Sequence, residues 1–164
     1  TKVRFPAQVL PATVVLTNLA NYLLSLPLLL GLGFAYGVVP SWHIVFFLPV
    51  VLLQTFFTLA LTYLFSSLNV AFRDLQHVMG NLVQMMFFLT PVLWPLEQVP
   101  AAWRETVLYG NPMAAVTVAY RSIFYLQAVP DARPLLVVAG FSLLVFWMAA
   151  SVFERRREEF AELV

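Results

Sequence analysis

The feature that most constrains this chain is a long stretch, residues 5–72, that contains no Asp, Glu, Lys or Arg. A transmembrane helix needs about 20 consecutive apolar residues, so this stretch is too long for one span and about right for two. Of all 164 residues, 62% are hydrophobic and 10% are charged, whereas soluble domains average about 45–50% and about 25%. The sequence therefore excludes a water-soluble enzyme, a disordered tail and a disulfide scaffold, and predicts an integral membrane protein.

We expect an all-α, polytopic integral membrane protein with four transmembrane helices and one additional helical hairpin. Pro11 and Pro134 suit the first turn of a helix, where the missing N–H costs nothing. Glycines and Pro in residues 31–41 predict a turn after the first span, and the polar residues 66–77 predict a loop after the second. The four predicted transmembrane helices are residues 13–32, 44–65, 78–94 and 134–153.

Residues 96–133 are too polar for an ordinary span. Arg121 would cost about 2.5–3.5 kcal/mol at the centre of the bilayer. Two short helices, residues 101–109 and 113–127, account for the composition better, because Gly110, Asn111 and Pro112 between them are typical of helix ends and helix starts. We interpret residues 96–133 as a re-entrant or interfacial hairpin that enters and leaves the membrane on its extracytoplasmic side.

The distribution of basic residues predicts the orientation. With four spans, both termini lie on the same side of the membrane as the loop that carries Arg73. That side then holds six of the nine basic residues, namely Lys2, Arg4, Arg73, Arg155, Arg156 and Arg157. The positive-inside rule places these residues, and with them the cytosolic segments 1–12 and 154–164, in the cytoplasm. By default both segments are basic anchors on anionic lipid, and the alternative is contact with a cytosolic partner.

Motifs for catalysis and cofactor binding are absent from the sequence. It has no G-x-x-x-x-G-K-[ST] loop, so the chain does not hold ATP phosphates as P-loop proteins do. His43 and His77 fall at opposite membrane interfaces, which argues against a metal site. The net charge of +1 supplies no basic field for nucleic acid. We therefore predict a transport protein, not an enzyme, whose energy comes from a gradient or a partner.

Uncharged polar residues recur at helical spacing in three of the predicted spans. They either join helices through hydrogen bonds worth about 0.6 kcal/mol on average, or line a path for a polar substrate. Four aromatic residues in the spans, Tyr22, Tyr63, Phe87 and Phe88, are likewise either packing residues or candidate channel-lining rings that stack on a sugar. The polar residues are Asn18, Asn21 and Ser25 in the first span, Gln54, Thr58 and Thr62 in the second, and Asn81 and Gln84 in the third.

Several short blocks, ordered along nearly the whole chain, resemble the permease subunit of ABC-2 type exporters. The resemblance is greatest to permeases that export O-antigen, teichoic acid and capsular polysaccharide. The blocks are KVRFP at residues 2–6, LNVAFRD at 68–74, FFLTPVLWP at 87–95, VP at 99–100 followed by Trp103, NPM at 111–113, YR at 120–121 and FERR at 153–156.

This resemblance implies a homodimer of permeases in the bacterial inner (plasma) membrane that moves a lipid-linked glycan. Cytosolic ATPase subunits would bind ATP and Mg, so this chain would need no cofactor of its own. The resemblance also implies that the chain corresponds to the C-terminal two-thirds of a six-span permease. The implied ATPase-coupling residues are Lys2, Arg4, Phe5 and Pro6, the cytosolic-loop residues are Asn69, Arg73 and Asp74, and the gate-hairpin residues are Pro95, Pro100, Trp103, Asn111, Pro112, Tyr120 and Arg121.

Two alternatives remain open. An ABC-2 exporter of a drug or small lipid would share the architecture and differ in its channel lining. A gradient-driven carrier or channel predicts charged residues at span centres, and the four predicted spans contain none.

Overall fold

The computed structural model of the chain describes residues 9–69 and 74–161, with side chains described as far as residue 152. Every regular element in these ranges is helical, which confirms the predicted all-α membrane protein. Two 3₁₀ turns, η1 (Trp42–Phe46) and η2 (Leu96–Gln98), precede α2 and α4. The helices are α1 (Val9–Ala35), α2 (Phe47–Asn69), α3 (Leu75–Leu89), α4 (Ala101–Gly110), α5 (Pro112–Phe124) and α6 (Ala132–Ala161).

Three helical segments are long and apolar enough to cross a membrane: Val9–Ala35, Trp42–Asn69 and Ala132–Val152. They cover the first, second and fourth predicted spans. The third prediction, residues 78–94, differs from the structure, because α3 ends at Leu89 and its 15 residues rise only about 22 Å. Pro91 explains the early end, since a proline disfavours helical backbone at the residue before it, and Thr90 is extended.

The end of α1 lies beyond its predicted boundary. Gly31 and Gly33 stay within the helix, so the turn predicted for residues 31–41 begins only after Ala35. The helix closes at Gly37, whose φ of +78° is readily adopted only by glycine. The next N–H, of Val38, donates to the Gly33 carbonyl at 2.8 Å, which is the bond pattern of a Schellman cap.

Three other boundaries also differ from the prediction. Residues 9–12, assigned to a cytosolic segment, belong to α1. The loop predicted at residues 66–77 is shorter, because α2 continues to Asn69 and α3 starts at Leu75. The second hairpin helix ends at Phe124 rather than at residue 127, because Gln127 has a left-handed φ of 49°.

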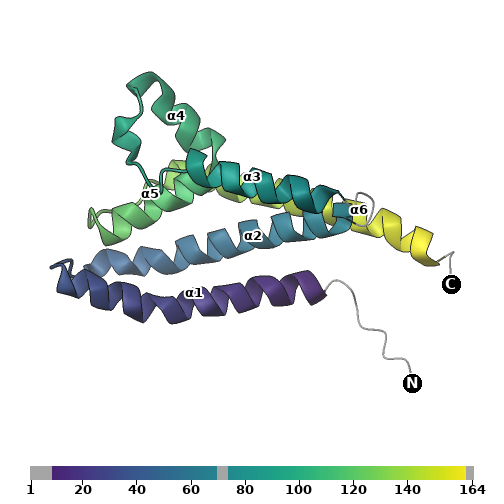
Figure 1. Cartoon of the computed structure of the whole chain (residues 1–164), viewed down its shortest axis with the longest axis horizontal. Coiled ribbons are helices and arrows are strands. Elements are labelled where there is room, and N and C mark those ends of the chain that lie inside the picture. Colours follow the sequence, from purple (N-terminus) through teal and green to yellow (C-terminus); the bar gives the residue numbers. More distant parts are fainter. Residues whose placement is uncertain (1–8, 70–73, 162–164) are drawn as a thin grey trace.

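The long helices lie alongside one another, and the hairpin formed by α4 and α5 lies at one end of them (Figure 1). The start of α1, the end of α2, the start of α3 and the end of α6 lie at the opposite end. The predicted topology likewise places the hairpin opposite to the chain ends, but the third of its four spans, at residues 78–94, corresponds to the 15-residue helix α3. Which end faces the cytoplasm remains a prediction from the charges.

The packed part of the molecule is made by α2, α5 and α6. Small residues are fully or nearly fully buried on α2 and α6, including Ala60 (0% exposed) and Ser142 (0%), and small residues allow helices in a membrane to approach closely. One core cluster joins Phe57, Ala115 and Val138 from these three helices. A second cluster joins Val50 of α2 to three residues of α5, namely Val116, Ala119 and Ile123.

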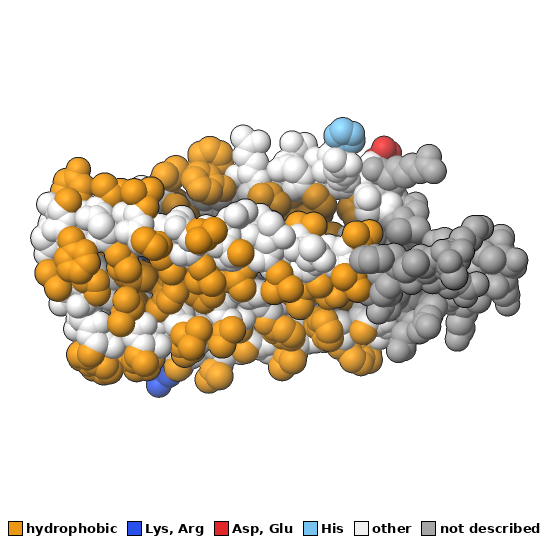
Figure 2. Space-filling model, turned by 90° about the horizontal axis from the view of Figure 1, so that it is seen from below, with side chains coloured by type: hydrophobic (Ala, Val, Ile, Leu, Met, Phe, Trp, Pro, Cys, Tyr) orange, Lys and Arg blue, Asp and Glu red, His pale blue; other side chains and the backbone are white. Residues whose placement is uncertain are grey.

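The helices α1 and α3 are far less buried. Val15 is the one buried residue of α1, and α3 has none within the described chain. Hydrophobic side chains extend along the described face seen from below (Figure 2). Such a surface suits contact with lipid or with further membrane helices.

Candidate functional site

The hairpin is held to the end of α3 by Asn111, which lies between α4 and α5. Its side chain accepts a hydrogen bond from the Met113 N–H at 3.0 Å and so caps α5. Its Nδ2 donates to Thr90 Oγ1 at 3.1 Å and to the Leu89 carbonyl at 3.3 Å. Pro112 occupies the first turn of α5, as predicted from the helix-start pattern. One side chain therefore fixes both the start of α5 and its position relative to α3.

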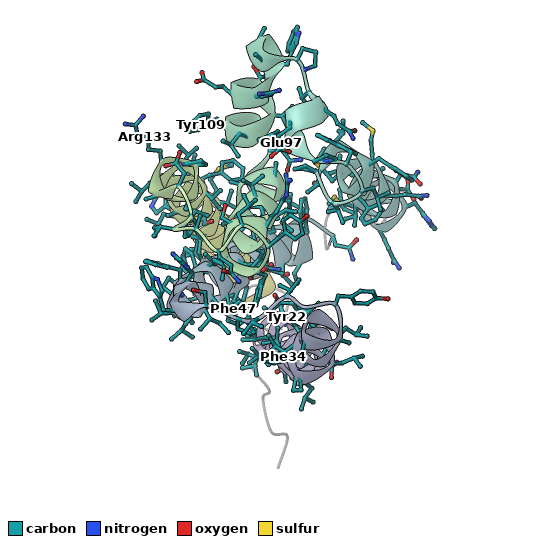
Figure 3. The ribbon with its side chains drawn as sticks, turned by 90° about the vertical axis from the view of Figure 1, so that its left-hand side faces the viewer. Tyr22, Phe34, Phe47, Glu97, Tyr109 and Arg133 are labelled. Atoms are coloured by element: carbon teal, nitrogen blue, oxygen red, sulfur yellow. The ribbon has the colours of Figure 1, made fainter. Side chains whose placement is uncertain are left out.

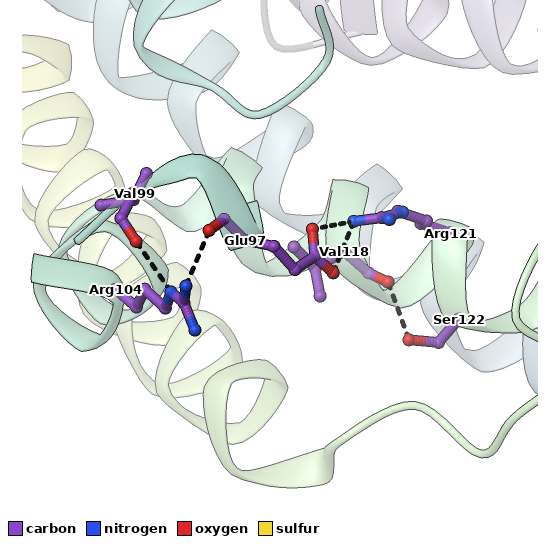
Figure 4. A network of polar contacts seen from close by, with 6 residues as sticks. All are labelled: Glu97, Val99, Arg104, Val118, Arg121 and Ser122. Carbon is purple, nitrogen blue, oxygen red and sulfur yellow. Dashed lines mark hydrogen bonds and ion pairs between the residues drawn. The ribbon is translucent and has the colours of Figure 1, made fainter. Parts of the chain in front are cut away.

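A second polar network ties η2 to both hairpin helices (Figure 4). Arg121 Nη1 lies 2.7 Å from Glu97 Oε2 and 2.9 Å from Glu97 Oε1. Arg104 donates from Nε to the Val99 carbonyl at 2.8 Å and from Nη2 to the Glu97 carbonyl at 2.7 Å. The hydrogen bond from Arg121, followed by backbone hydrogen bonding, lowers the pKa of Glu97 below its usual 4.5. Arg121 is thus paired with a carboxylate, which accounts for its presence in an otherwise apolar helix.

Four aromatic rings gather where α1, α2 and α5 meet. Phe47 lies at the centre, with ring centroids 5.5 Å from Phe124, 5.8 Å from Tyr120 and 6.3 Å from Tyr22. The view along the bundle shows Tyr22 and Phe47 side by side between α1 and α2 (Figure 3). This cluster connects the hairpin helix α5 to α1, which has few other buried contacts.

A pocket of about 170 Å³ lies next to this aromatic cluster, between α1 and α2. The Tyr120 hydroxyl donates to Gln54 Oε1 at 2.5 Å and so joins α5 to the pocket wall. Gln54 is near the middle of the Trp42–Asn69 segment, so this hydrogen bond lies far from both ends of that segment. The lining residues are Val15, Asn18, Leu19, Tyr22, Val51, Gln54, Thr55 and Thr58.

Asn18 of the first polar stripe therefore faces Gln54 and Thr58 of the second across this pocket, but the hydroxyl groups of the stripes do not join the helices. Thr58 donates to the Gln54 carbonyl at 2.9 Å, Thr62 to the Thr58 carbonyl at 2.7 Å and Ser25 to the Tyr22 carbonyl at 2.7 Å, all within their own helices. Such bonds satisfy hydroxyl groups without a second helix. Within the described chain, Asn18 and the Nε2 group of Gln54 have no hydrogen-bond partner.

The other predicted channel-lining rings lie elsewhere. Tyr63 of α2 packs edge-on against Phe146 of α6 with a centroid distance of 6.2 Å. Phe87 and Phe88 contact each other at 5.6 Å and are exposed on α3. Whether any of the four rings lines a channel stays a prediction.

The remaining predicted site residues lie at the two ends of the bundle. Asn69 ends α2, and Asp74 precedes α3 without a side-chain cap. Pro95 and Pro100 precede η2 and α4, and Trp103 of α4 is 62% exposed. Lys2, Arg4, Phe5, Pro6 and Arg73 lie outside the described residues. In the part of the chain that the structure describes, no group of three or more His, Asp or Glu side chains is placed to bind a metal.

Sequence reasoning did not single out Glu97, Thr90 or Phe47. The signal for Glu97 was available, because an Arg in an apolar helix requires a partner and Glu97 is one of few acidic residues nearby in sequence. No local pattern identifies Phe47 among the 15 Phe residues, since its role depends on three helices meeting.

The fold and this site define a multi-pass membrane protein in which a short-helix hairpin packs into one end of a helical bundle. Residues 2–125 match the model of the family described as ABC-2 type transporter. The chain belongs to this family.

Three curated relatives cover essentially the whole chain. An O-antigen export system permease protein RfbA of Myxococcus xanthus is 54% identical over 165 aligned positions, which are 100% of this chain and 64% of that protein. Two proteins of the same name from Klebsiella pneumoniae are 28% and 26% identical, over 99% of this chain and 62% of each protein. The chain therefore spans less than two-thirds of the length of these relatives.

Proposed function

We propose that the chain is part of the permease subunit of an ATP-driven exporter that moves a lipid-linked polysaccharide, such as O-antigen, across the inner membrane. The observation that carries this proposal is the 54% identity to a protein named as an O-antigen export permease, over the whole of this chain. Family membership supports a transporter, and three helices of spanning length support a membrane location.

In this proposal the chain is not the ATPase. A separate cytosolic subunit binds ATP and Mg, hydrolyses the nucleotide and contacts Lys2, Arg4, Phe5 and Pro6. A second copy of the permease completes the translocation path. Both chain ends face the cytoplasm, supported by the six basic residues at that side in the four-span topology.

The hairpin is the proposed extracytoplasmic gate. Its helix α5 contacts α2 and α6 through a buried face that includes Ala115 and Val116, so a displacement of those helices would displace α5. Asn111 and the pair Glu97–Arg121 hold the hairpin together and to the end of α3. A movement of the bundle would therefore reach the hairpin through direct contacts.

Deletion of the full-length gene, followed by analysis of lipid-linked glycans, tests this function. We expect glycan to accumulate on the cytoplasmic side, and the full-length protein to restore export and to co-purify with an ATPase subunit. The double variant Arg4→Glu with Phe5→Ala should insert into the membrane but fail to export. Normal glycan display in the deletion strain would instead favour export of a drug or small lipid, and export without any ATPase partner would favour a gradient-driven carrier.

A further inference from the structure

The two helices of the hairpin are fastened to the rest of the chain very differently. The second helix, α5, belongs to the packed core, because five of its 13 residues are buried and Tyr120 bonds to Gln54 of α2. The first helix, α4, has no buried residue and projects away from the long helices (Figure 1). Its half-buried Leu108, which packs against the core cluster around Phe57, lies in the last turn, next to α5. A movement within the hairpin is therefore easier for α4 than for α5.

Residues 95–110, the flap, comprise η2 and α4 and form a unit that is rigid within itself. Arg104, in the first turn of α4, reaches back along the chain to η2 and to the residue after it. It donates from Nε to the Val99 carbonyl at 2.8 Å and from Nη2 to the Glu97 carbonyl at 2.7 Å. Because both bonds stay within the flap, η2 and α4 move as one body.

The flap leaves and rejoins the rest of the chain at one place. Asn111, which precedes α5, donates from Nδ2 to Oγ1 of Thr90, which follows α3, at 3.1 Å. Trp94, directly before the flap, donates to the Phe88 carbonyl at 3.0 Å and so stays with α3. Segments whose ends meet in this way, as in Ω-loops, form compact surface units that are frequently functional. The contact between Thr90 and Asn111 is therefore a neck about which the flap can turn.

An ion pair holds the flap to α5 at a point remote from this neck. Arg121 lies ten residues after Asn111, about 15 Å along α5, and its Nη1 contacts both carboxylate oxygens of Glu97 at 2.7 and 2.9 Å (Figure 4). In the described part of the chain, no other side-chain hydrogen bond or ion pair joins residues 95–110 to another element. The two side chains are 32% and 61% exposed, and exposed ion pairs are weak and sensitive to salt. A weak contact far from the neck suits a catch that opens and closes.

We propose that the flap opens about its neck while α5 stays in the bundle, and that the ion pair between Glu97 and Arg121 is the catch that keeps the flap closed. The proposal rests on the proposed role of the hairpin as the extracytoplasmic gate and adds which part of the hairpin moves. α5 follows movements of α2 and α6, with which it shares the buried clusters, whereas the flap moves relative to all three. Opening of the flap is a step of export.

Distances between spin labels test the movement in the full-length permease with its ATPase partner in lipid nanodiscs. This chain has no cysteine, and any cysteines elsewhere in the full-length protein are replaced. Thr106→Cys labels the flap and Tyr125→Cys labels the end of α5, each paired with Arg133→Cys at the start of α6, and all three positions are exposed. Labelled copies are diluted with unlabelled copies, so that each distance lies within one chain. We expect two distances for the flap pair and one for the α5 pair, and only the open component of the flap pair should grow when a hydrolysis-deficient partner binds ATP.

The catch is tested by changing its two charges. Glu97→Gln should raise the ratio of open to closed flap about threefold, as expected for the loss of an exposed ion pair. Molar salt should raise the ratio similarly in the wild type and have little effect in this variant. The exchanged pair, Glu97→Arg with Arg121→Glu, should restore part of the closed population, which a merely destabilised hairpin would not do. Glu105→Gln removes an exposed carboxylate from the same helix and, as the matched control, should leave the ratio unchanged.

The role of the flap in export is tested by locking it closed. A bifunctional methanethiosulfonate long enough to replace both side chains bridges Glu97→Cys and Arg121→Cys. We expect the bridge to stop export until a reductant releases it. A monofunctional methanethiosulfonate on the same variant is the control and should leave export largely intact, because it modifies both positions without joining them.

The outcomes separate this inference from the proposed function. A single unchanged distance for the flap pair in every state would overturn the inference, and so would an equal change of both pairs, because the hairpin would then move as one body. An unchanged ratio in Glu97→Gln, or continued export with the bridged flap, would overturn it as well. In all these cases wild-type export would stand, whereas absence of glycan export by the wild type would overturn the proposed function itself.

Discussion

The unit formed by α2, α5 and α6 differs sharply in packing from the two helices α1 and α3. α5 has only 13 residues and buries five of them, whereas α1 has 27 residues and buries one. In α1 and α3, polar side chains such as Asn18, Asn81 and Gln84 are exposed. Hydropathy therefore identifies membrane helices, but it does not indicate which of them form the packed core. The first group forms the packed core of the described chain, and the second leaves most of its apolar surface exposed.

The largest effect is expected from filling the α2 core position Ala60. Ala60→Phe places a large ring at a side chain that is 0% exposed, and overpacking of this kind typically costs about 1–3 kcal/mol. We expect a clear fall in the midpoint of thermal unfolding of the purified full-length complex. Ala20→Phe makes the same substitution at an exposed position of α1 and should change the midpoint little. Equal loss from both variants would contradict the division into a packed unit and peripheral helices.

The second-largest loss of stability is expected at Asn111, which connects the hairpin to α3. Asn111→Ala removes the cap of α5 and the donor to Thr90, and loss of a cap alone costs about 1 kcal/mol. Thermal unfolding measures the stability, and protease sensitivity near residues 90–112 reports whether the hairpin separates from α3. The control is Asn81→Ala, an exposed position on α3. If the Asn111 variant behaved like this control, the capping role would be wrong.

The bond between Tyr120 and Gln54 should have a smaller effect. Tyr120→Phe keeps the ring in its cluster and removes the hydroxyl, and hydrogen bonds between membrane helices average about 0.6 kcal/mol. A double-mutant cycle with Gln54→Leu, read by thermal unfolding, should show a coupling of that order. Tyr125→Phe, at a 69% exposed residue, is the control. Additive effects of the two substitutions would show that this hydrogen bond contributes nothing.

The smallest effect is expected from the exposed ion pair between Glu97 and Arg121. Because the folded protein lowers the pKa of Glu97, its stabilising contribution is present above the unfolded value of about 4.5 and is lost as the pH falls through the lowered folded value. Glu97→Gln should therefore reduce the pH dependence of the unfolding midpoint below about pH 5. The Glu105→Gln variant changes an exposed carboxylate on α4 and serves as the control. An unchanged pH profile in the Glu97 variant would show that the pair has no effect on stability.

Much of this architecture could be predicted from the sequence, because its causes are local. The uncharged stretch predicted two spans, and Gly110, Asn111 and Pro112 predicted the break between α4 and α5, since glycine, capping residues and proline act on their own backbone. The early end of α3 had a local signal too, in Pro91, but the apolar residues that follow outweighed it in the hydropathy pattern. The length of α1 was misjudged because a helix tolerates glycines in an apolar environment.

The candidate site was only partly predictable, because its contacts join residues far apart in sequence. The stripe containing Gln54 and Thr58 was visible as helical spacing, but nothing in that spacing indicates that Gln54 would contact Tyr120, 66 positions later. For the same reason the threonine stripes were open to an interhelical interpretation that the structure does not support, since those hydroxyls bond to their own helices. The packing of α5 against α2, which local sequence patterns do not reveal, brings Gln54 and Tyr120 together.

The most direct test of the account is a cysteine cross-link between α2 and α5 in the full-length permease in native membranes. Val50 and Ala119 belong to one buried cluster, so Val50→Cys with Ala119→Cys should form a disulfide under mild oxidation. Val50→Cys with Val83→Cys, on exposed α3, should not cross-link. Absence of the first cross-link, or formation of both at equal rates, would contradict the claim that the hairpin helix is an integral part of the packed unit.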